Sequence, residues 1–228
     1  MDLVFEDRGE AGRALARELA PLAGRVDLLV LGLPRGGVPV AFEVARCLSA
    51  PLDVFVVRKL GVPGQEELAF GALASGGITV RNPDIIRRFA LSEETIACVT
   101  ARERAELERR EVLYRGGRSF PSLDNSTVIL VDDGVATGAS IRAAARAIRS
   151  RNPAEVLIAV PVASAEALAE IADDADRVIC LSVPSRFRAV GEFYRDFRST
   201  TDDEVRVLLA RRTQGPREEA PWPTPRTV

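Results

Sequence analysis

The residues best suited to chemistry lie in one short segment, which reads VILVDDGVATGAS from Val128 to Ser140. Its four leading apolar residues predict a buried strand that ends at the carboxyl edge of a sheet, where ligands bind in α/β proteins. The loop that follows has two glycines, which let backbone amides approach an anion, and two hydroxyl donors in Thr137 and Ser140. Because a predicted helix begins at this loop with the positive end of its dipole, the segment predicts a site for a phosphate monoester.

Two acids, Asp132 and Asp133, stand immediately before this loop. Strand alternation would place them on opposite faces, but Asp133 falls where the strand ends, so both can turn toward one ligand. Adjacent carboxylates repel each other and are best tolerated facing a cation or hydrogen-bond donors, such as two vicinal sugar hydroxyls. The segment lacks the GK[ST] of a Walker A loop and the GxGxxG of a dinucleotide site. An acidic strand end before an ordinary helix remains the structural alternative.

Further cations lie at the ends of two other predicted strands. The first of these strands is followed by a turn in which Arg35 precedes Gly36 and Gly37. The second ends at Arg58 and Lys59, and Lys59 is the only lysine among 31 basic residues. A compact ammonium and a guanidinium at the edge of the sheet suit an anionic ligand. In the alternative interpretation, they are surface cations beside plain turns.

The elements that must position these residues follow an α/β pattern, in which short β-branched apolar runs alternate with longer amphipathic stretches. This pattern predicts a mainly parallel sheet flanked by helices. The expected strands cover residues 27–31, 52–58, 127–132, 155–160 and 177–181, and the expected helices cover 10–19, 38–48, 138–150, 165–172 and 202–211. Residues 1–212 are expected to form one domain, and the proline-rich residues 213–228 a disordered tail.

Two further elements are expected between the second and third strands. Residues 69–81 predict a β-hairpin with Ser75-Gly76-Gly77 at its turn. Ser92 is expected to cap a long charged helix that reaches Tyr114. Acids and arginines alternate on this helix at i,i+4 spacing, so we interpret it as mostly solvated rather than as a nucleic-acid surface.

The composition excludes several classes of function. The chain contains no histidine, which excludes Ser-His-Asp and Cys-His catalysis and HExxH zinc sites. Cys47, Cys98 and Cys180 lie far apart among apolar neighbours, so we interpret them as buried thiols rather than as disulfides or metal ligands. The net charge of −2 and the isoelectric point of about 5.5 argue against a nucleic-acid partner. Apolar runs too short for a bilayer and no secretory signal lead us to expect a cytoplasmic protein without a membrane partner.

The segment from Val128 to Ser140 resembles the phosphoribosyl-diphosphate signature of type I phosphoribosyltransferases, which has four apolar residues, two acids and a loop ending in Thr-Gly-x-Ser/Thr. The RKLGxPG and AVGxxY segments are similar to those of a group of bacterial phosphoribosyltransferase-like proteins, over roughly residues 1–212. The resemblance implies Mg²⁺-dependent transfer of a phosphoribosyl group from 5-phosphoribosyl 1-diphosphate to a nitrogenous base or related acceptor, with release of diphosphate, as in nucleotide salvage. It also implies a type I phosphoribosyltransferase-like fold with a lid insertion and a small hood.

The resemblance also assigns roles to residues. Asp132 and Asp133 would hold the ribose hydroxyls, and Arg35 and Gly36 would hold the diphosphate leaving group. From its position at the strand end, we expect Lys59 to contact the diphosphate oxygens as well. Asp132, Asp133, Arg35 and Lys59 are therefore the expected catalytic residues. Mg²⁺ would be held mainly by ligand oxygens and waters, with Asp132 as a candidate protein contact. The lid that excludes water is expected between residues 65 and 117. The expected substrate-binding residues are Gly36, Gly37, Arg58, Gly134, Val135, Ala136, Thr137, Gly138, Ala139, Ser140, Phe187 and Tyr194.

The sequence does not identify the acceptor. Phe187 and Tyr194 lie in an aromatic-rich stretch of a chain with 5% aromatic residues, and they either stack on a planar base or anchor the core. Enzymes that act on 6-oxopurines usually carry an acid where Ala136 stands, which argues against hypoxanthine, guanine or xanthine. The alternative function is a non-catalytic protein of the same fold that senses 5-phosphoribosyl 1-diphosphate as a regulator. Association as a homodimer is left open.

Overall fold

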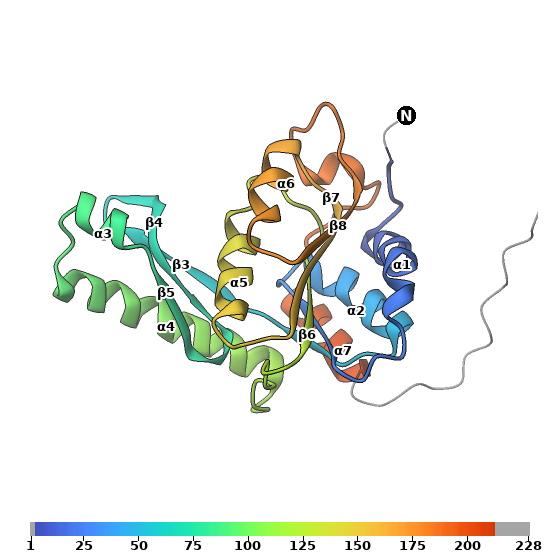
Figure 1. Ribbon diagram of the computed structural model, residues 1–228, viewed down its shortest axis with the longest axis horizontal. Coiled ribbons are helices and arrows are strands. Elements are labelled where there is room, and N and C mark those ends of the chain that lie inside the picture. The colour runs from blue at the N-terminus through green and yellow to red at the C-terminus, as the bar shows by residue number, and fades with distance from the viewer. Residues whose placement is uncertain (1–2, 213–228) are drawn as a thin grey trace, which may run out of the picture.

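A five-stranded parallel sheet forms the centre of the computed structural model, which describes residues 3–212. The strands lie in the order β2-β1-β6-β7-β8 (Figure 1). Because β1 and β6 are neighbours, with Gly32 paired to Val131, the segments that follow these two strands lie side by side at the carboxyl edge. The bounds of the strands are β1 (Leu28–Gly32), β2 (Leu52–Val54), β6 (Thr127–Val131), β7 (Glu155–Val162) and β8 (Arg177–Ser182).

Helices cover both faces of this sheet (Figure 1). One face is covered by α1 (Arg8–Leu19), α2 (Gly37–Leu48) and α7 (Asp202–Arg212), and the other by α5 (Ala139–Arg149) and α6 (Ala165–Ala172). Short 3₁₀ turns are η1 (Ala20–Leu22), η2 (Ser75–Gly77) and η3 (Val190–Phe193). The prediction of a mainly parallel sheet flanked by helices is therefore confirmed. The predicted tail, residues 213–228, lies outside the described residues.

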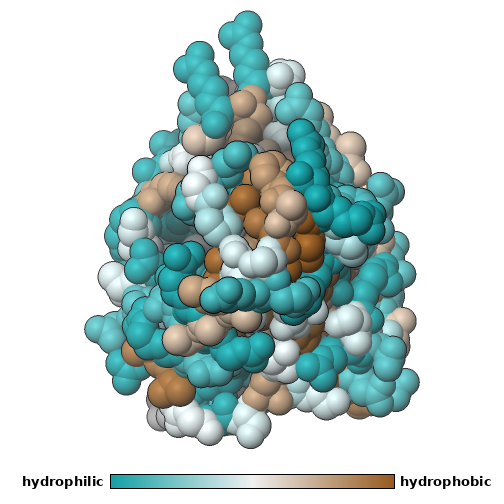
Figure 2. Space-filling view, turned by 90° about the vertical axis from the view of Figure 1, so that its left-hand side faces the viewer, coloured by the Kyte–Doolittle hydropathy of each residue, from teal (hydrophilic) through white to brown (hydrophobic). Residues whose placement is uncertain are grey.

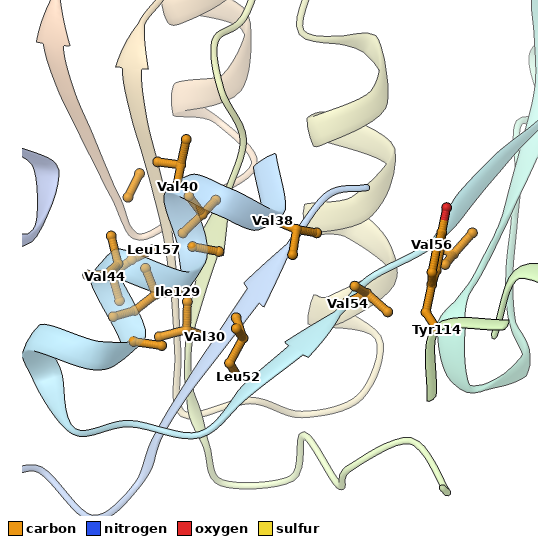
Figure 3. Close-up of a cluster of buried hydrophobic side chains, with 14 of the residues drawn as sticks. Val30, Val38, Val40, Val44, Leu52, Val54, Val56, Tyr114, Ile129 and Leu157 are labelled. Carbon is orange, nitrogen blue, oxygen red and sulfur yellow. The ribbon is translucent and has the colours of Figure 1, made fainter. Parts of the chain in front are cut away.

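Strand alternation divides the core into two apolar layers. Val30, Ile129 and Leu157 point from neighbouring strands toward Val40 and Val44 of α2 (Figure 3). The intervening strand residues point to the opposite face and pack against α5 and α6. Each such side chain stabilises the fold by about 1.5–3 kcal/mol when fully buried. Packing on both faces explains why the strands read as continuous apolar runs.

An arm, defined as residues 57–115, projects from the central sheet (Figure 1). It contains an antiparallel sheet of β3 (Val57–Val62), β4 (Gln65–Ala74) and β5 (Ile78–Arg81), followed by α3 (Pro83–Arg88) and α4 (Glu93–Arg115). The predicted hairpin and its Ser75–Gly77 turn are confirmed, as is the Ser92 cap of the long helix. Figure 2 views the end of the arm and shows hydrophobic residues among hydrophilic ones.

Two sequence-based expectations about local structure were wrong, and one short helix was not predicted. The single strand predicted over residues 52–58 is two strands in different sheets, because the chain leaves β2 after Val54 and enters the arm at Val57. The α3 helix was not predicted, since it is only six residues long. The thiols of Cys47 and Cys98 are exposed rather than buried, because their apolar sequence neighbours occupy other faces of α2 and α4. None of the described helices is both long enough and apolar enough to span a membrane.

Candidate active site

Three segments meet at the carboxyl edge of the central sheet. They are the turn after β1, the loop after β6 and a hood, which we define as residues 183–200. The turn is joined to β6 by a hydrogen bond from the Leu33 amide to the Val131 carbonyl, 2.9 Å long. The hood packs on the loop so closely that a Cβ atom added to Gly134 would lie 2.4 Å from Val190. Residues far apart in the sequence therefore meet at this edge of the sheet.

The glycine loop, defined as residues 134–140, connects β6 to the start of α5. Two hydrogen bonds, each 2.9 Å long, fix the loop. The Val135 amide donates to the Val162 carbonyl of β7, and the Ala136 carbonyl accepts from the Ser164 hydroxyl. Gly138 has a φ of +72°, which favours glycine, and it begins α5. Within residues 3–212, none of the amides from Ala136 to Ser140 donates to another protein group. Five free amides at a helix start suit an anion such as a phosphate.

The two acids differ in their electrostatic environment. Asp133 forms an ion pair with Arg8, whose Nε lies 2.8 Å from its Oδ2. Asp132 is half-buried and accepts a 2.9 Å hydrogen bond from the Asp133 amide. Burial first, and then the charge of Asp133, raise the pKa of Asp132 well above its usual range. The two carboxyl groups therefore differ, because Asp133 is paired with a cation whereas the charged form of Asp132 is disfavoured.

Glycines bring the turn after β1 into contact with these acids. A Cβ atom at Gly36 would lie 2.0 Å from Oδ2 of Asp133, and one at Gly37 would lie 2.9 Å from Oδ1 of Asp132. Neither position can carry a side chain without displacing an acid. The peptide bond between Pro34 and Arg35 is cis. Half of the Arg35 side chain is exposed to solvent beside this turn, and its guanidinium lies 3.9 Å from Asp202.

Strand alternation separates the predicted pair Arg58 and Lys59. Arg58 points toward α4, where its Nε and Nη2 donate to Oε2 of Glu103 at 2.9 and 2.5 Å. Lys59 points to the other face of the arm sheet and lines a cavity of about 660 Å³. That cavity reaches Ala139, the residue at which α5 begins. The two cations thus cannot both face one ligand, and only Lys59 lies on the side of the glycine loop.

The aromatic residues of the hood pack mainly against each other. Tyr194 is buried, with its ring 5.6 Å from that of Phe5 and 5.1 Å from that of Phe197. Its hydroxyl donates to the Asp133 carbonyl. The expectation that Tyr194 stacks on a base does not fit this placement, because its ring faces are covered by protein. Phe187 is half-buried and stacks on Phe193 at 5.5 Å, so only part of its ring is accessible.

Sequence reasoning missed three residues that shape the site. Arg8 forms an ion pair with Asp133, and Glu103 forms one with Arg58. Ser164 donates a hydrogen bond to the glycine loop. No local pattern marks any of them, because each contact joins residues at least 28 positions apart. Within the described residues, no group of three or more His, Cys, Asp or Glu side chains could hold a metal ion. A divalent cation at this edge would therefore take most of its ligands from a bound substrate.

Comparisons with known proteins agree with this geometry. The family model for the phosphoribosyl transferase domain matches residues 6–198. The chain is similar to the crystal structure of TT1426 from Thermus thermophilus, with a TM-score of 0.83 and 45% identity over 92% of this chain and 99% of that one. Two Mycobacterium tuberculosis proteins, from strains CDC 1551 and H37Rv, are named as candidate phosphoribosyl transferases and are each 49% identical over 208 residues. These residues are 91% of this chain and 47% of each relative, so the chain spans about half the length of these curated relatives.

Proposed function

Because the chain belongs to the phosphoribosyl transferase domain family, we propose that it transfers the phosphoribosyl group of 5-phosphoribosyl 1-diphosphate to a nitrogenous base or related acceptor. The observation that carries the proposal is the arrangement of five free amides directly after two carboxyl groups. The amides from Ala136 to Ser140 bind the 5′-phosphate, and the side chains of Asp132 and Asp133 bind the ribose hydroxyls. The two acids are adjacent in the chain at the end of β6, so each can engage one of the two vicinal hydroxyls.

The leaving group lies on the side of the turn after β1. As the acceptor nitrogen attacks C1, the C1–O bond breaks and its electron pair leaves with the diphosphate, while the acceptor gives up its proton to solvent. The guanidinium of Arg35 neutralises part of the charge that develops on the diphosphate. Lys59 adds a second positive charge from the arm, across the cavity that reaches Ala139. This assignment explains why a lone ammonium faces the glycine loop.

The carboxyl oxygens of Asp132 and Asp133 are ligand types that suit Mg²⁺. A bound Mg²⁺ ion supplies charge neutralisation on the diphosphate oxygens. Because no group of three or more His, Cys, Asp or Glu side chains among the described residues could hold a metal ion, such side chains would supply at most two of its ligands, and Asp132 is the candidate contact. Arg35 and Lys59 place positive charge beside the same group without a metal ion.

Water must be excluded, since it would otherwise hydrolyse the activated sugar. We propose that the segment between residues 65 and 117, which includes most of the arm, covers the site when substrate binds. The arm stands beside α5 and carries Lys59 toward the start of that helix. Hydrogen exchange in this segment should slow when 5-phosphoribosyl 1-diphosphate and Mg²⁺ are added. Unchanged exchange in the presence of bound substrate would refute the lid.

A diphosphate-release assay with 5-phosphoribosyl 1-diphosphate, Mg²⁺ and a panel of bases tests the transferase. We expect release that depends on one class of base and falls at least about 100-fold in Asp133→Asn, as is usual when transition-state electrostatics are removed. Glu18→Gln, at an exposed position of α1, is the control for loss of an acid elsewhere. Tight binding of the donor without turnover on any base would instead support the regulatory alternative.

The role of Lys59 has its own test. Lys59→Ala should weaken binding of 5-phosphoribosyl 1-diphosphate, measured by calorimetry, and leave binding of ribose 5-phosphate nearly unchanged, because only the former carries the diphosphate. Arg206→Ala, at an exposed cation of α7, is the matched control. Equal dissociation constants for the wild type and Lys59→Ala would show that Lys59 does not contact the leaving group.

A further inference from the structure

The Arg8 side chain lies beside the acid pair and contacts protein groups on several sides. No sequence motif and no comparison with a known protein assigns it a role. Its Nε donates to Oδ2 of Asp133 at 2.8 Å, and its Nη1 donates to the carbonyl of Arg198 at 2.8 Å. Its guanidinium carbon lies 4.0 Å from the centre of the Phe197 ring. Only 11% of the side chain is exposed. Because the planar guanidinium of Arg8 contacts a carboxylate, a carbonyl and an aromatic ring, it has little freedom to move and can fix the orientation of the carboxylate that it binds.

We propose that Arg8 is a positioning residue for the transfer reaction, which orients the Asp133 carboxylate and couples it to the hood. The inference rests on the proposed function, in which Asp133 binds a ribose hydroxyl. Arg8 engages Oδ2 of Asp133 and leaves Oδ1 outside this ion pair. One oxygen of the carboxylate is thus fixed by protein, and the other remains available to accept from a sugar hydroxyl.

The hood also holds Asp133 through its backbone. Tyr194 donates its hydroxyl to the Asp133 carbonyl, and its ring stacks on Phe197, the same ring that lies beneath the Arg8 guanidinium. Arg8 and Tyr194 therefore link the side chain and the backbone of one acid to the same aromatic cluster. A shift of the hood when an acceptor enters would be transmitted to the carboxylate that holds the ribose.

The surroundings of Asp133 explain why a cation is needed there. The next residue along the chain, Asp132, is a second half-buried carboxyl group, and Arg8 is the cation that pairs with Asp133 within residues 3–212. Without Arg8, the two neighbouring carboxyl groups would lack this ion pair, and Oδ2 of Asp133 would lose the donor that fixes its position. Arg8 thus holds the Asp133 carboxylate in one orientation, in which it can accept from a sugar hydroxyl.

Two substitutions and one control test this role. Arg8→Gln should raise the dissociation constant of ribose 5-phosphate and the KM for 5-phosphoribosyl 1-diphosphate by about 10- to 100-fold, the range for losing a hydrogen bond to a charged group. The kcat at saturating substrate should change less than the KM, because Arg8 positions a binding group and does not itself touch the reacting atoms. Arg8→Lys keeps the charge but lacks the planar fork, so it should restore only part of the affinity. Arg195→Gln, at an exposed hood arginine paired with Glu6, should change neither the dissociation constant nor the KM.

The outcomes separate this inference from the proposed function. If Arg8→Gln lowers thermal stability but leaves the KM and the dissociation constant unchanged, Arg8 is a structural residue and the inference is wrong. If Arg8→Gln does not fold, the inference depends on Arg8→Lys, which must show reduced affinity while its kcat stays near the wild-type value. If the wild-type protein binds neither ribose 5-phosphate nor 5-phosphoribosyl 1-diphosphate, the proposed function fails and the positioning role falls with it.

Discussion

Arg115 anchors the arm to the central sheet through a buried guanidinium. Its side chain is 3% exposed and forms an ion pair with Asp53 at 3.0 Å. It also donates to the Val54 carbonyl at 2.7 Å and to the Ser75 hydroxyl at 3.1 Å. These partners come from the end of β2 and from the turn of the arm hairpin, so one side chain joins two sheets. We expect Arg115→Met to destabilise the protein more than most single substitutions.

The expected loss follows from the partner that is left behind. Asp53 would remain buried without its cation, and breaking a buried ion pair by removing one partner costs about 3–5 kcal/mol. The Val54 carbonyl and the Ser75 hydroxyl would also lose a donor. Since domains are stabilised by about 5–15 kcal/mol, this loss is a large fraction of the total. Urea unfolding of the wild type and of Arg115→Met measures the difference in the free energy of unfolding.

The pH dependence gives a second measurement with a defined sign. Burial is the main cause that raises the pKa of Asp53, and the charge of Arg115 acts in the opposite direction. An acid with a raised pKa stabilises the fold below its unfolded pKa, and this stability is lost as the pH rises. Removing Arg115 raises the pKa of Asp53 further, so the penalty in Arg115→Met should be larger near pH 8 than near pH 5.

Two variants complete the test of the anchor. Asp53→Asn in the Arg115→Met background removes the unpaired charge and should recover part of the lost stability. Arg109→Met, at an exposed position of the same helix, should change the free energy of unfolding by less than about 0.5 kcal/mol. A loss below about 1 kcal/mol in Arg115→Met, equal at both pH values, would refute the reasoning.

Three further predictions concern the site and its surroundings. Asp132→Asn should stabilise the free protein near pH 8 but not near pH 3. The raised pKa of Asp132 in the wild type lowers the free energy of unfolding only as the pH rises, and the asparagine removes that cost. Urea unfolding that shows no pH-dependent gain would contradict this prediction. Gly36→Ala should cost about 1–3 kcal/mol and weaken ribose 5-phosphate binding by displacing Asp133, and unchanged calorimetry would show that the turn yields instead. Ultraviolet titration should show both tyrosines still protonated near pH 10, since burial raises the pKa of Tyr114 to about 12 and raises that of Tyr194 as well; a normal titration would mean that the rings are solvated.

The central sheet could be predicted because its signals are local. Each of its strands is a short apolar run, and the capping residue Ser92 likewise marks the start of the long helix directly. The break between β2 and β3 could not be predicted in this way. Residues 52–58 form one apolar run, and the change of sheet depends on Arg115 and Ser75, which bind the chain at the break from 19 to 61 positions away. A local pattern carries no information about such partners.

The glycine loop and the two acids could likewise be recognised from residue types alone, because phosphate binding uses backbone amides that neighbouring residues supply. The faces of Arg58 and Lys59 illustrate the limit. Alternation requires that they point in opposite directions, but only the packing of α4 on one side and α5 on the other decides which cation reaches the site. Treating the two as one cationic pair ignored the period of the strand.

The placement of Arg8 shows why the environment of an acid pair is a property of the fold. Arg8 stands 125 positions before Asp133, and it reaches the strand edge because α1 begins beneath the hood. The sequence around either residue does not indicate this ion pair, since an arginine at a helix start and an acid at a strand end are both common. Two adjacent carboxyl groups at a half-buried edge nevertheless require a compensating charge, and Arg35, which points toward Asp202, does not supply it. The motif therefore implies that some cation must arrive from elsewhere, and the topology determines that this cation comes from the start of α1.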